Sequence, residues 1–167
     1  MTVSELIRTK RAVRQFTDEL LPEEAIRSIL NAGRRAQSSK NTQPWHFIAI
    51  RDPETLRQLS QCGMYAGHLA GAPFAVALTA SAADGFDLGQ AAASMQLAAW
   101  ELGIGSCIAS MWEPEKAMKI LGIPHDQQFD VVISFGYPLH GREQSHPPKL
   151  NGRKPFAEVV FWERWGG

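Results

Sequence analysis

Residues 37–45 read QSSKNTQPW and concentrate hydrogen-bonding side chains of the kind that line small-molecule sites. Two serines and three carboxamides precede the Pro-Trp pair, and the apolar run 46–50 (HFIAI) follows directly. A polar loop that leads into a buried strand is a common place for a scaffold to present groups to a ligand. Carboxamides both donate and accept hydrogen bonds, which suits a heteroaromatic ring edged with carbonyls and ring nitrogens. The same residue types also favour ordinary surface turns, so that alternative stays open.

A second segment, residues 10–16 (KRAVRQF), is strongly basic and ends on an aromatic residue. Its three cations are Lys10, Arg11 and Arg14. A guanidinium matches phosphate oxygens bidentately, so the cluster indicates an anion site. The alternative is a solvated basic helix end, where cations complement the helix dipole. That alternative is common for one arginine and weaker for three cations.

Together the two segments resemble the nitroreductase family of FMN-dependent enzymes. That family carries an Arg-Arg-Ser-x-Arg element near its N-terminus and a Pro-Ser-Ser-x-Asn-x-Gln-Pro-Trp loop about one helix later. The resemblance continues through residues 103–107 (GIGSC), 136–138 (GYP) and 152–160 (GRKPFAEVV), so it spans nearly the whole chain. The Asn-x-Gln-Pro-Trp loop is its most specific part, and the glycine-containing pieces are weak individually.

The resemblance implies an FMN site built from four parts of the chain. The residues implied to contact FMN are Lys10, Arg11, Ala12, Arg14, Ser38, Ser39, Asn41, Gln43, Ile108, Ala109, Ser110, Met111 and Arg153. By resemblance, the cations grip the phosphate or the pyrimidine edge of the ring, where positive charge favours the anionic reduced flavin. Residues 108–111 are implied to lie against one flavin face, and the polar loop is implied to come from the opposite subunit to some of the other contacts.

The chain departs from the family pattern at three of these places. Ala12 stands where Ser is usual, which removes a hydrogen bond worth about 1 kcal/mol. Gln37 replaces the usual Pro, which loosens the loop entropically without removing a contact group. Asn151 stands where better-known members often have Lys, and either Lys149 or Lys154 is a candidate to replace that charge.

The bulk properties indicate one globular domain, residues 1–167. The chain is 44% hydrophobic, and its 17 basic and 17 acidic residues balance, so nothing favours a nucleic-acid surface. Two distant cysteines without CxxC spacing fit a reduced, cytoplasmic protein. The first residues lack a signal-peptide pattern, and no apolar run approaches the roughly 20 residues of a membrane span. Residues 156–165 are very apolar, and we expect the segment 150–167 to wrap a partner subunit.

Hydrophobic periodicity and capping residues predict alternating helices and strands. We expect helices near residues 3–7, 21–33, 53–61, 86–102 and 113–121, strands near 45–51, 73–79, 104–109 and 129–135, and a last extended element at 156–165. Such alternation ordinarily favours a parallel, doubly wound sheet. The resemblance instead implies an α+β fold, with a mixed, mainly antiparallel sheet flanked by helices, in a homodimer. We follow the resemblance, because the pattern alone does not determine strand direction.

Three other signals do not indicate a functional site. Gly103 and Gly105 follow a predicted helix instead of a strand and lack a third glycine, so a dinucleotide fingerprint fails on context. The five histidines show no ligand-like spacing, so no metal site is expected. Ser106 and Cys107 with distant histidines are no evidence for a hydrolase, and Asp87 is expected to act as the N-terminal charge of its helix.

The expected function is hydride transfer from NAD(P)H through FMN to a nitroaromatic, quinone or similar acceptor, by a ping-pong mechanism without a catalytic side chain. Two alternatives stay open. One is a flavin-binding or storage protein with little turnover, and the other is a different reaction on the same scaffold, such as reductive dehalogenation. The sequence does not distinguish NADH from NADPH.

Overall fold

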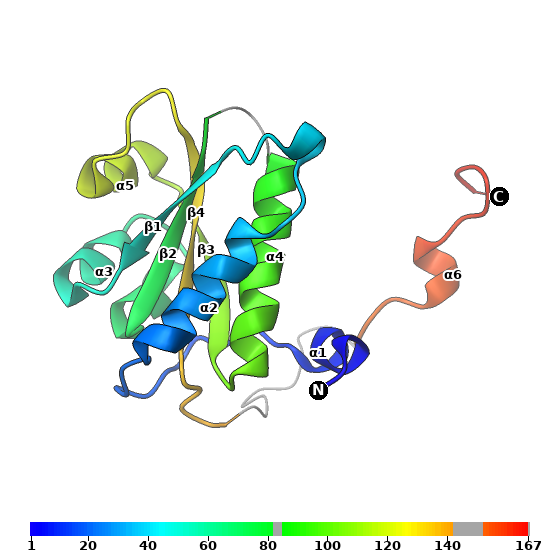
Figure 1. The fold of residues 1–167 in the computed structure, drawn as a ribbon, viewed down its shortest axis with the longest axis horizontal. Coiled ribbons are helices and arrows are strands. Elements are labelled where there is room, and N and C mark those ends of the chain that lie inside the picture. Colours follow the sequence, from blue (N-terminus) through cyan, green and yellow to red (C-terminus); the bar gives the residue numbers. More distant parts are fainter. Residues whose placement is uncertain (82–84, 142–151, 167) are drawn as a thin grey trace.

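The computed structural model describes residues 1–81, 85–141 and 152–166. Its centre is a four-stranded sheet with helices on both faces (Figure 1). The strands are β1 (Trp45–Ile50), β2 (Phe74–Ala80), β3 (Gly105–Ser110) and β4 (Gln128–Gly136). They lie in the order β1-β2-β4-β3, and every pair is antiparallel. The α+β fold with a mainly antiparallel sheet is therefore confirmed, and the one parallel pairing described is an isolated bridge between Ala12 and Ser106.

All helices but the last follow predicted helical segments closely. The helices are α1 (Val3–Thr9), α2 (Glu23–Arg34), α3 (Pro53–Leu59), α4 (Gly85–Glu101), α5 (Pro114–Leu121) and α6 (Phe156–Val159). Two 3-10 turns, η1 (Ser39–Asn41) and η2 (Ala66–Gly71), were not predicted. Local chemistry explains several boundaries: Thr2 and Glu5 form a capping box on α1, and Gly122 ends α5 with a φ of 65° that L residues rarely adopt.

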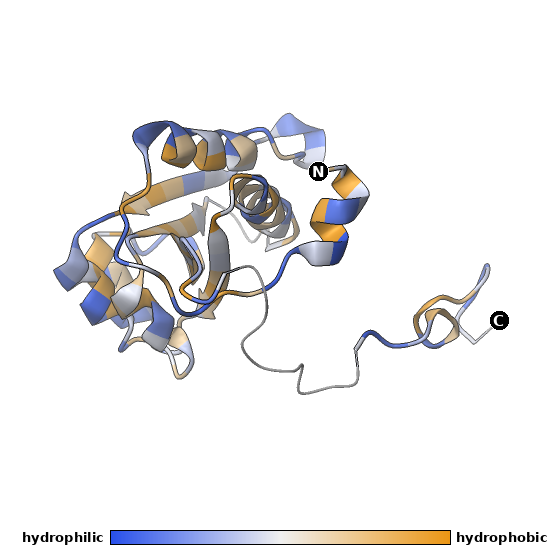
Figure 2. Cartoon of the chain, turned by 90° about the horizontal axis from the view of Figure 1, so that it is seen from below, coloured by the Kyte–Doolittle hydropathy of each residue, from blue (hydrophilic) through white to orange (hydrophobic). Residues whose placement is uncertain are grey.

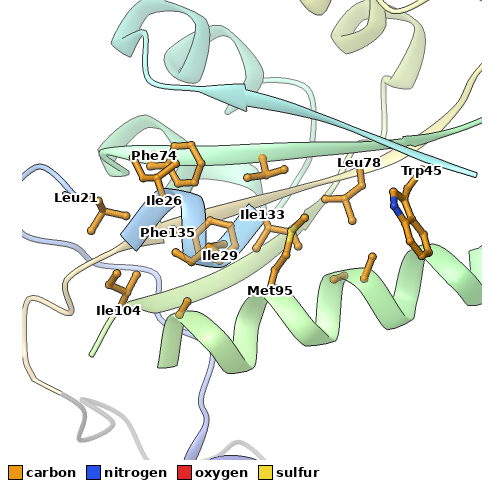
Figure 3. Close-up of a cluster of buried hydrophobic side chains, with 14 of the residues drawn as sticks. Leu21, Ile26, Ile29, Trp45, Phe74, Leu78, Met95, Ile104, Ile133 and Phe135 are labelled. Atoms are coloured by element: carbon orange, nitrogen blue, oxygen red, sulfur yellow. The ribbon is translucent and has the colours of Figure 1, made fainter. Parts of the chain in front are cut away.

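The sheet separates two apolar cores because successive residues of a strand point to opposite faces. On one face α2 and α4 pack over Phe74, Ile133 and Phe135 (Figure 3). On the other face η2, α3 and α5 cover Ala77 and Val132, among others. Strand β2 is buried along its whole length, as expected for a central strand. Packing of the two cores against the sheet fixes the positions of its edges. The candidate site residues lie at these edges.

Helix α4, which is rich in small residues, packs closely against α2. A Cβ built on Gly33 would lie 2.2 Å from the Cε of Met95. Any side chain at residue 33 would therefore force the Met95 side chain to shift. The close helix partner lies within this chain.

The C-terminal segment departs from the sequence prediction. Residues 156–159 form the helical turn α6, so the expected extended element is wrong there. Both views show α6 lying apart from the body of the molecule (Figures 1 and 2). The large apolar side chains of the C-terminal segment are exposed, with Trp165 at 89% and Phe156 at 68%. Residues 142–151, including Lys149 and Asn151, lie outside the described residues. No described helix is long and apolar enough to cross a membrane.

Candidate functional site

The basic segment runs along the outer edge of β3. The Val13 N–H donates to the Ser106 carbonyl at 2.9 Å, and Phe16 forms a second bridge with Pro138. Gly105 permits this approach, because a Cβ there would lie 2.5 Å from a methyl carbon of Val13. Gly105 is thus explained by packing and Gly103 by its φ of 83°, and Ala12, which lies in the β-bridge, contributes its backbone to the same edge.

Lys10 is half-buried and is held by a chain of polar side chains. Its Nζ donates to the Gln96 Oε1 at 3.1 Å, and the Gln96 Nε2 donates to the Ser106 Oγ at 3.2 Å. Burial, and secondarily the nearby charge of Arg153, lower the pKa of Lys10. A bound anion interacts strongly with a cation that is partly desolvated and lies near a second cation.

Arg14 is exposed, and its charge acts on two neighbours. Burial raises the pKa of the Cys107 thiol, while the charges of Arg14 and Lys10 oppose that rise. Burial and, as a smaller cause, the charge of Arg14 together lower the pKa of His68 to about 4. Within residues 1–81, 85–141 and 152–166, no carboxylate lies within ion-pair distance of Lys10, Arg14 or Arg153. These three residues therefore form a positive cluster that is not neutralised by the described residues.

Arg11 has a different position from the other predicted cations. Its Nη1 donates to the carbonyl oxygens of Arg8 at 2.7 Å and Lys10 at 2.9 Å. In this conformation the guanidinium satisfies backbone acceptors at the C-terminal end of α1. The structure therefore groups Lys10, Arg14 and Arg153, and places Arg11 in a capping role.

The polar loop is tied to the N-terminal end of α4. The Asp87 Oδ2 accepts from the Ser39 N–H at 2.9 Å, and the Ser38 Oγ accepts from the Gln43 N–H at 3.0 Å. Asp87 lies in the first turn of α4, as predicted, and the link to the loop is an additional role. Asn41 and Gln43 have φ values of 56° and 50°, which non-glycine residues rarely adopt. Such backbone conformations concentrate where loops bind ligands.

The polar loop and the positive cluster lie at different parts of α4. Asp87 holds the loop, and Gln96, which holds Lys10, follows nine positions later on the same helix. At 1.5 Å per residue this is about 14 Å along the helix axis, and 100° per residue puts the two side chains on opposite sides of it. A single subunit thus carries the two halves of the predicted site at separate places.

The segment 108–111 alternates between the core and the surface. Ala109 and Met111 are buried, whereas Ile108 is 43% exposed and Ser110 is exposed. Gly63 allows the chain to pass close to the C-terminal end of β3, because a Cβ on residue 63 would lie 2.3 Å from the Ser110 carbonyl oxygen. The alternation leaves the outward side of this edge strand available for a ligand.

One buried polar pair near the site was not predicted. The Nδ1 of His68 lies 2.8 Å from the Ser134 Oγ, and Ser134 also donates to the Cys107 carbonyl at 3.3 Å. Ser134 comes from the central strand β4, 66 positions from His68, so no local pattern connects them. The sequence offered His68 only as one of five histidines without ligand-like spacing.

Comparison with known proteins identifies the family. The family model described as "Nitroreductase family" matches residues 7–64 and 61–137, more than half of the chain. This chain belongs to the nitroreductase family. A protein of Archaeoglobus fulgidus that bears the name of an NADH dehydrogenase/NAD(P)H nitroreductase is 35% identical over 145 residues, covering 80% of this chain and 83% of its own length.

Solved structures of the nitroreductase family have the same fold over nearly their full length. An FMN-dependent nitroreductase from Clostridium difficile R20291 has a TM-score of 0.82 at 27% identity, covering 96% of this chain and 98% of its own. A Desulfovibrio desulfuricans structure, named as a nitroreductase and solved in complex with FMN, has a TM-score of 0.82 at 28% identity, covering 99% and 98%. The resemblance read from the motifs is confirmed.

Proposed function

We propose that this protein is an FMN-dependent oxidoreductase that passes a hydride from NAD(P)H through FMN to a nitroaromatic, quinone or similar acceptor. The observation that carries the proposal is the positive cluster of Lys10, Arg14 and Arg153, which none of the described carboxylates neutralises. Its composition suits a phosphate-bearing cofactor. The nitroreductase relatives bear names that state FMN or NAD(P)H, which supports the same cofactor and donor here.

The residues present fit FMN, which supplies the hydride-transfer chemistry when bound. Lys10, Arg14 and Arg153 bind the phosphate or the ring's pyrimidine edge, where positive charge stabilises the reduced form. The edge of β3 from residue 108 to 111 offers backbone groups to one ring face, and no side chain has to act as an acid or base. The opposite ring face would stay open for a nicotinamide and then for an acceptor to enter in turn.

We propose in addition that the complete site forms in a homodimer. The loop of residues 38–43 lies about 14 Å along α4 from the positive cluster, so the loop of one subunit completes the site of the other. The apolar tail supports this, because the exposed Phe156, Trp162 and Trp165 need a surface that covers them. In this arrangement the segment 150–167 wraps the partner subunit.

Two measurements test the proposed function. Mass analysis of the flavin released from purified protein identifies the cofactor, and we expect FMN in stoichiometric amount. Steady-state oxidation of NADH and NADPH with a quinone or nitroaromatic then separates an enzyme from a flavin-storage protein, which holds FMN but turns over negligibly. Lys10→Ala should lose FMN, whereas the matched Lys116→Ala, at an exposed lysine paired with Glu113, should keep it. Bound FAD, or FMN retained by Lys10→Ala, would contradict the proposal.

A further inference from the structure

We propose that Gln96 is a positioning residue for phosphate recognition: its amide fixes the Lys10 ammonium towards the cofactor while leaving the positive charge of Lys10 intact. This inference rests on the proposed function, because it assigns Lys10 to the FMN phosphate. It adds a residue of α4 that makes no contact with the cofactor itself but determines how strongly the protein prefers FMN to riboflavin, the same flavin without a phosphate.

The amide of Gln96 has one orientation because both of its ends are occupied. Gln96 is 6% exposed, and its Oε1 faces the Lys10 Nζ at 3.1 Å while its Nε2 faces the Ser106 Oγ at 3.2 Å. Reversing the amide would place its NH₂ group against an ammonium and lose the bond to Lys10, because two donors cannot pair. Ser106 is itself buried and anchors the basic segment through its carbonyl, which accepts from the Val13 N–H. Gln96 thus ties α4, β3 and the basic segment together at Lys10.

A neutral partner is what an anion site requires at this position. A carbonyl oxygen aligns the ammonium through a hydrogen bond and leaves a full positive charge for a ligand. A carboxylate at residue 96 would form a partly buried ion pair with Lys10 and cancel that charge. Among the described residues no carboxylate pairs with Lys10, and burial lowers the pKa of its ammonium, so a bound anion would supply the missing counter-charge.

The simpler interpretation is that Gln96 is a buried amide that only satisfies its own hydrogen-bonding groups. Under that interpretation, a change at residue 96 alters stability, and it alters the affinities for FMN and riboflavin by the same factor. Under the positioning role, the loss is confined to the ligand that carries a phosphate. The ratio of the two dissociation constants therefore separates the interpretations.

The experiment uses the full chain as apo-protein and three variants. Gln96→Glu introduces the carboxylate, and Gln96→Met keeps the length of the side chain but removes its polar groups. Asn31→Asp is the matched control, because Asn31 is an exposed amide whose Oδ1 accepts from a cation, the Arg34 Nε at 3.1 Å. The dissociation constants of FMN and riboflavin are measured by quenching of flavin fluorescence, and the Lys10 pKa by NMR of its side-chain carbon resonances.

We expect Gln96→Glu to weaken FMN binding by about ten- to a hundredfold, the loss of a charge-assisted contact, while riboflavin binding changes less than about threefold. The pKa of Lys10 in the apo-protein should rise in the same variant. Gln96→Met should lower the preference for FMN by a smaller factor, and Asn31→Asp should leave it unchanged.

Each other outcome has a distinct meaning. An unchanged ratio of FMN to riboflavin affinity in Gln96→Glu and Gln96→Met, with wild-type protein that prefers FMN, overturns the role of Gln96 and leaves the proposed function standing. Wild-type protein that binds neither flavin overturns the proposed function. If Gln96→Glu does not fold, the ratio measured with Gln96→Met decides alone, since that variant also breaks both amide bonds.

Discussion

The buried His68 makes stability depend on pH in a defined direction. His68 is 9% exposed, and burial together with the charge of Arg14 lowers its pKa to about 4 from an ordinary value of 6.5. The unfolded chain therefore takes up a proton on this ring at a higher pH than the folded chain does. As pH falls from about 6.5 to about 4, protonation favours unfolding, and the stability present above pH 6.5 is lost. At about 1.4 kcal/mol per tenfold difference in proton affinity, the full loss is about 3 kcal/mol.

The assay is urea unfolding of apo-protein at several pH values between 7.5 and 4, at one protein concentration. His68→Gln removes the titrating ring and keeps a carboxamide within reach of the Ser134 hydroxyl. The wild-type free energy of unfolding minus that of His68→Gln should fall by up to about 3 kcal/mol across this range. His125→Gln, at a surface residue whose side chain is 89% exposed, is the matched exchange away from the core.

A difference between wild type and His68→Gln that stays constant with pH would refute the reasoning, because it would mean that the ring has the same pKa in both states. A difference that grows on acidification would mean that the folded protein holds a protonated, paired His68. In either case, His68 would not be the neutral, buried ring that the lowered pKa describes.

Three further predictions concern the site and its support. Arg14→Ala should weaken FMN binding by about ten- to a hundredfold at low salt and by a smaller factor at high salt, where the lost ionic contact is already screened, as measured by titrating apo-protein; unchanged affinity would argue against Arg14 as a cofactor contact. Gly63→Ala should destabilise the fold by about 1–3 kcal/mol, because the added Cβ meets the Ser110 carbonyl oxygen at 2.3 Å, and an unaltered melting temperature would contradict that contact. Deleting the residues after Lys154 should give monomer or aggregate without flavin by size-exclusion chromatography; a monomer that retains FMN would contradict the dimeric site.

Most elements of the fold were predictable because their signals are local. Thr2 and Pro53 mark helix starts, Gly122 marks a helix end, and residues 74–80 form an apolar run of strand length. Strand direction was not predictable from pattern, because alternating helices and strands are compatible with parallel and antiparallel sheets. The antiparallel arrangement came from the family resemblance.

The support of the site was less predictable than its motifs. The loop and the basic segment are contiguous in sequence, so their composition identified them. The bond between Lys10 and Gln96 joins residues 86 positions apart, and that between Ser39 and Asp87 spans 48 positions. Such contacts depend on how α4 packs against the sheet, which no local pattern encodes. For the same reason, the sequence grouped Arg11 with the other cations, although its side chain contacts backbone carbonyls at the end of α1.

The most direct test of the proposed function is a pair of anaerobic half-reactions on FMN-loaded protein. We expect NADH or NADPH to bleach the flavin absorption in the first. After the nicotinamide is removed, a quinone or nitroaromatic should restore the oxidised spectrum in the second. Protein that binds no flavin, or bound FMN that neither nicotinamide reduces, would contradict the assignment of this chain as an FMN-dependent oxidoreductase.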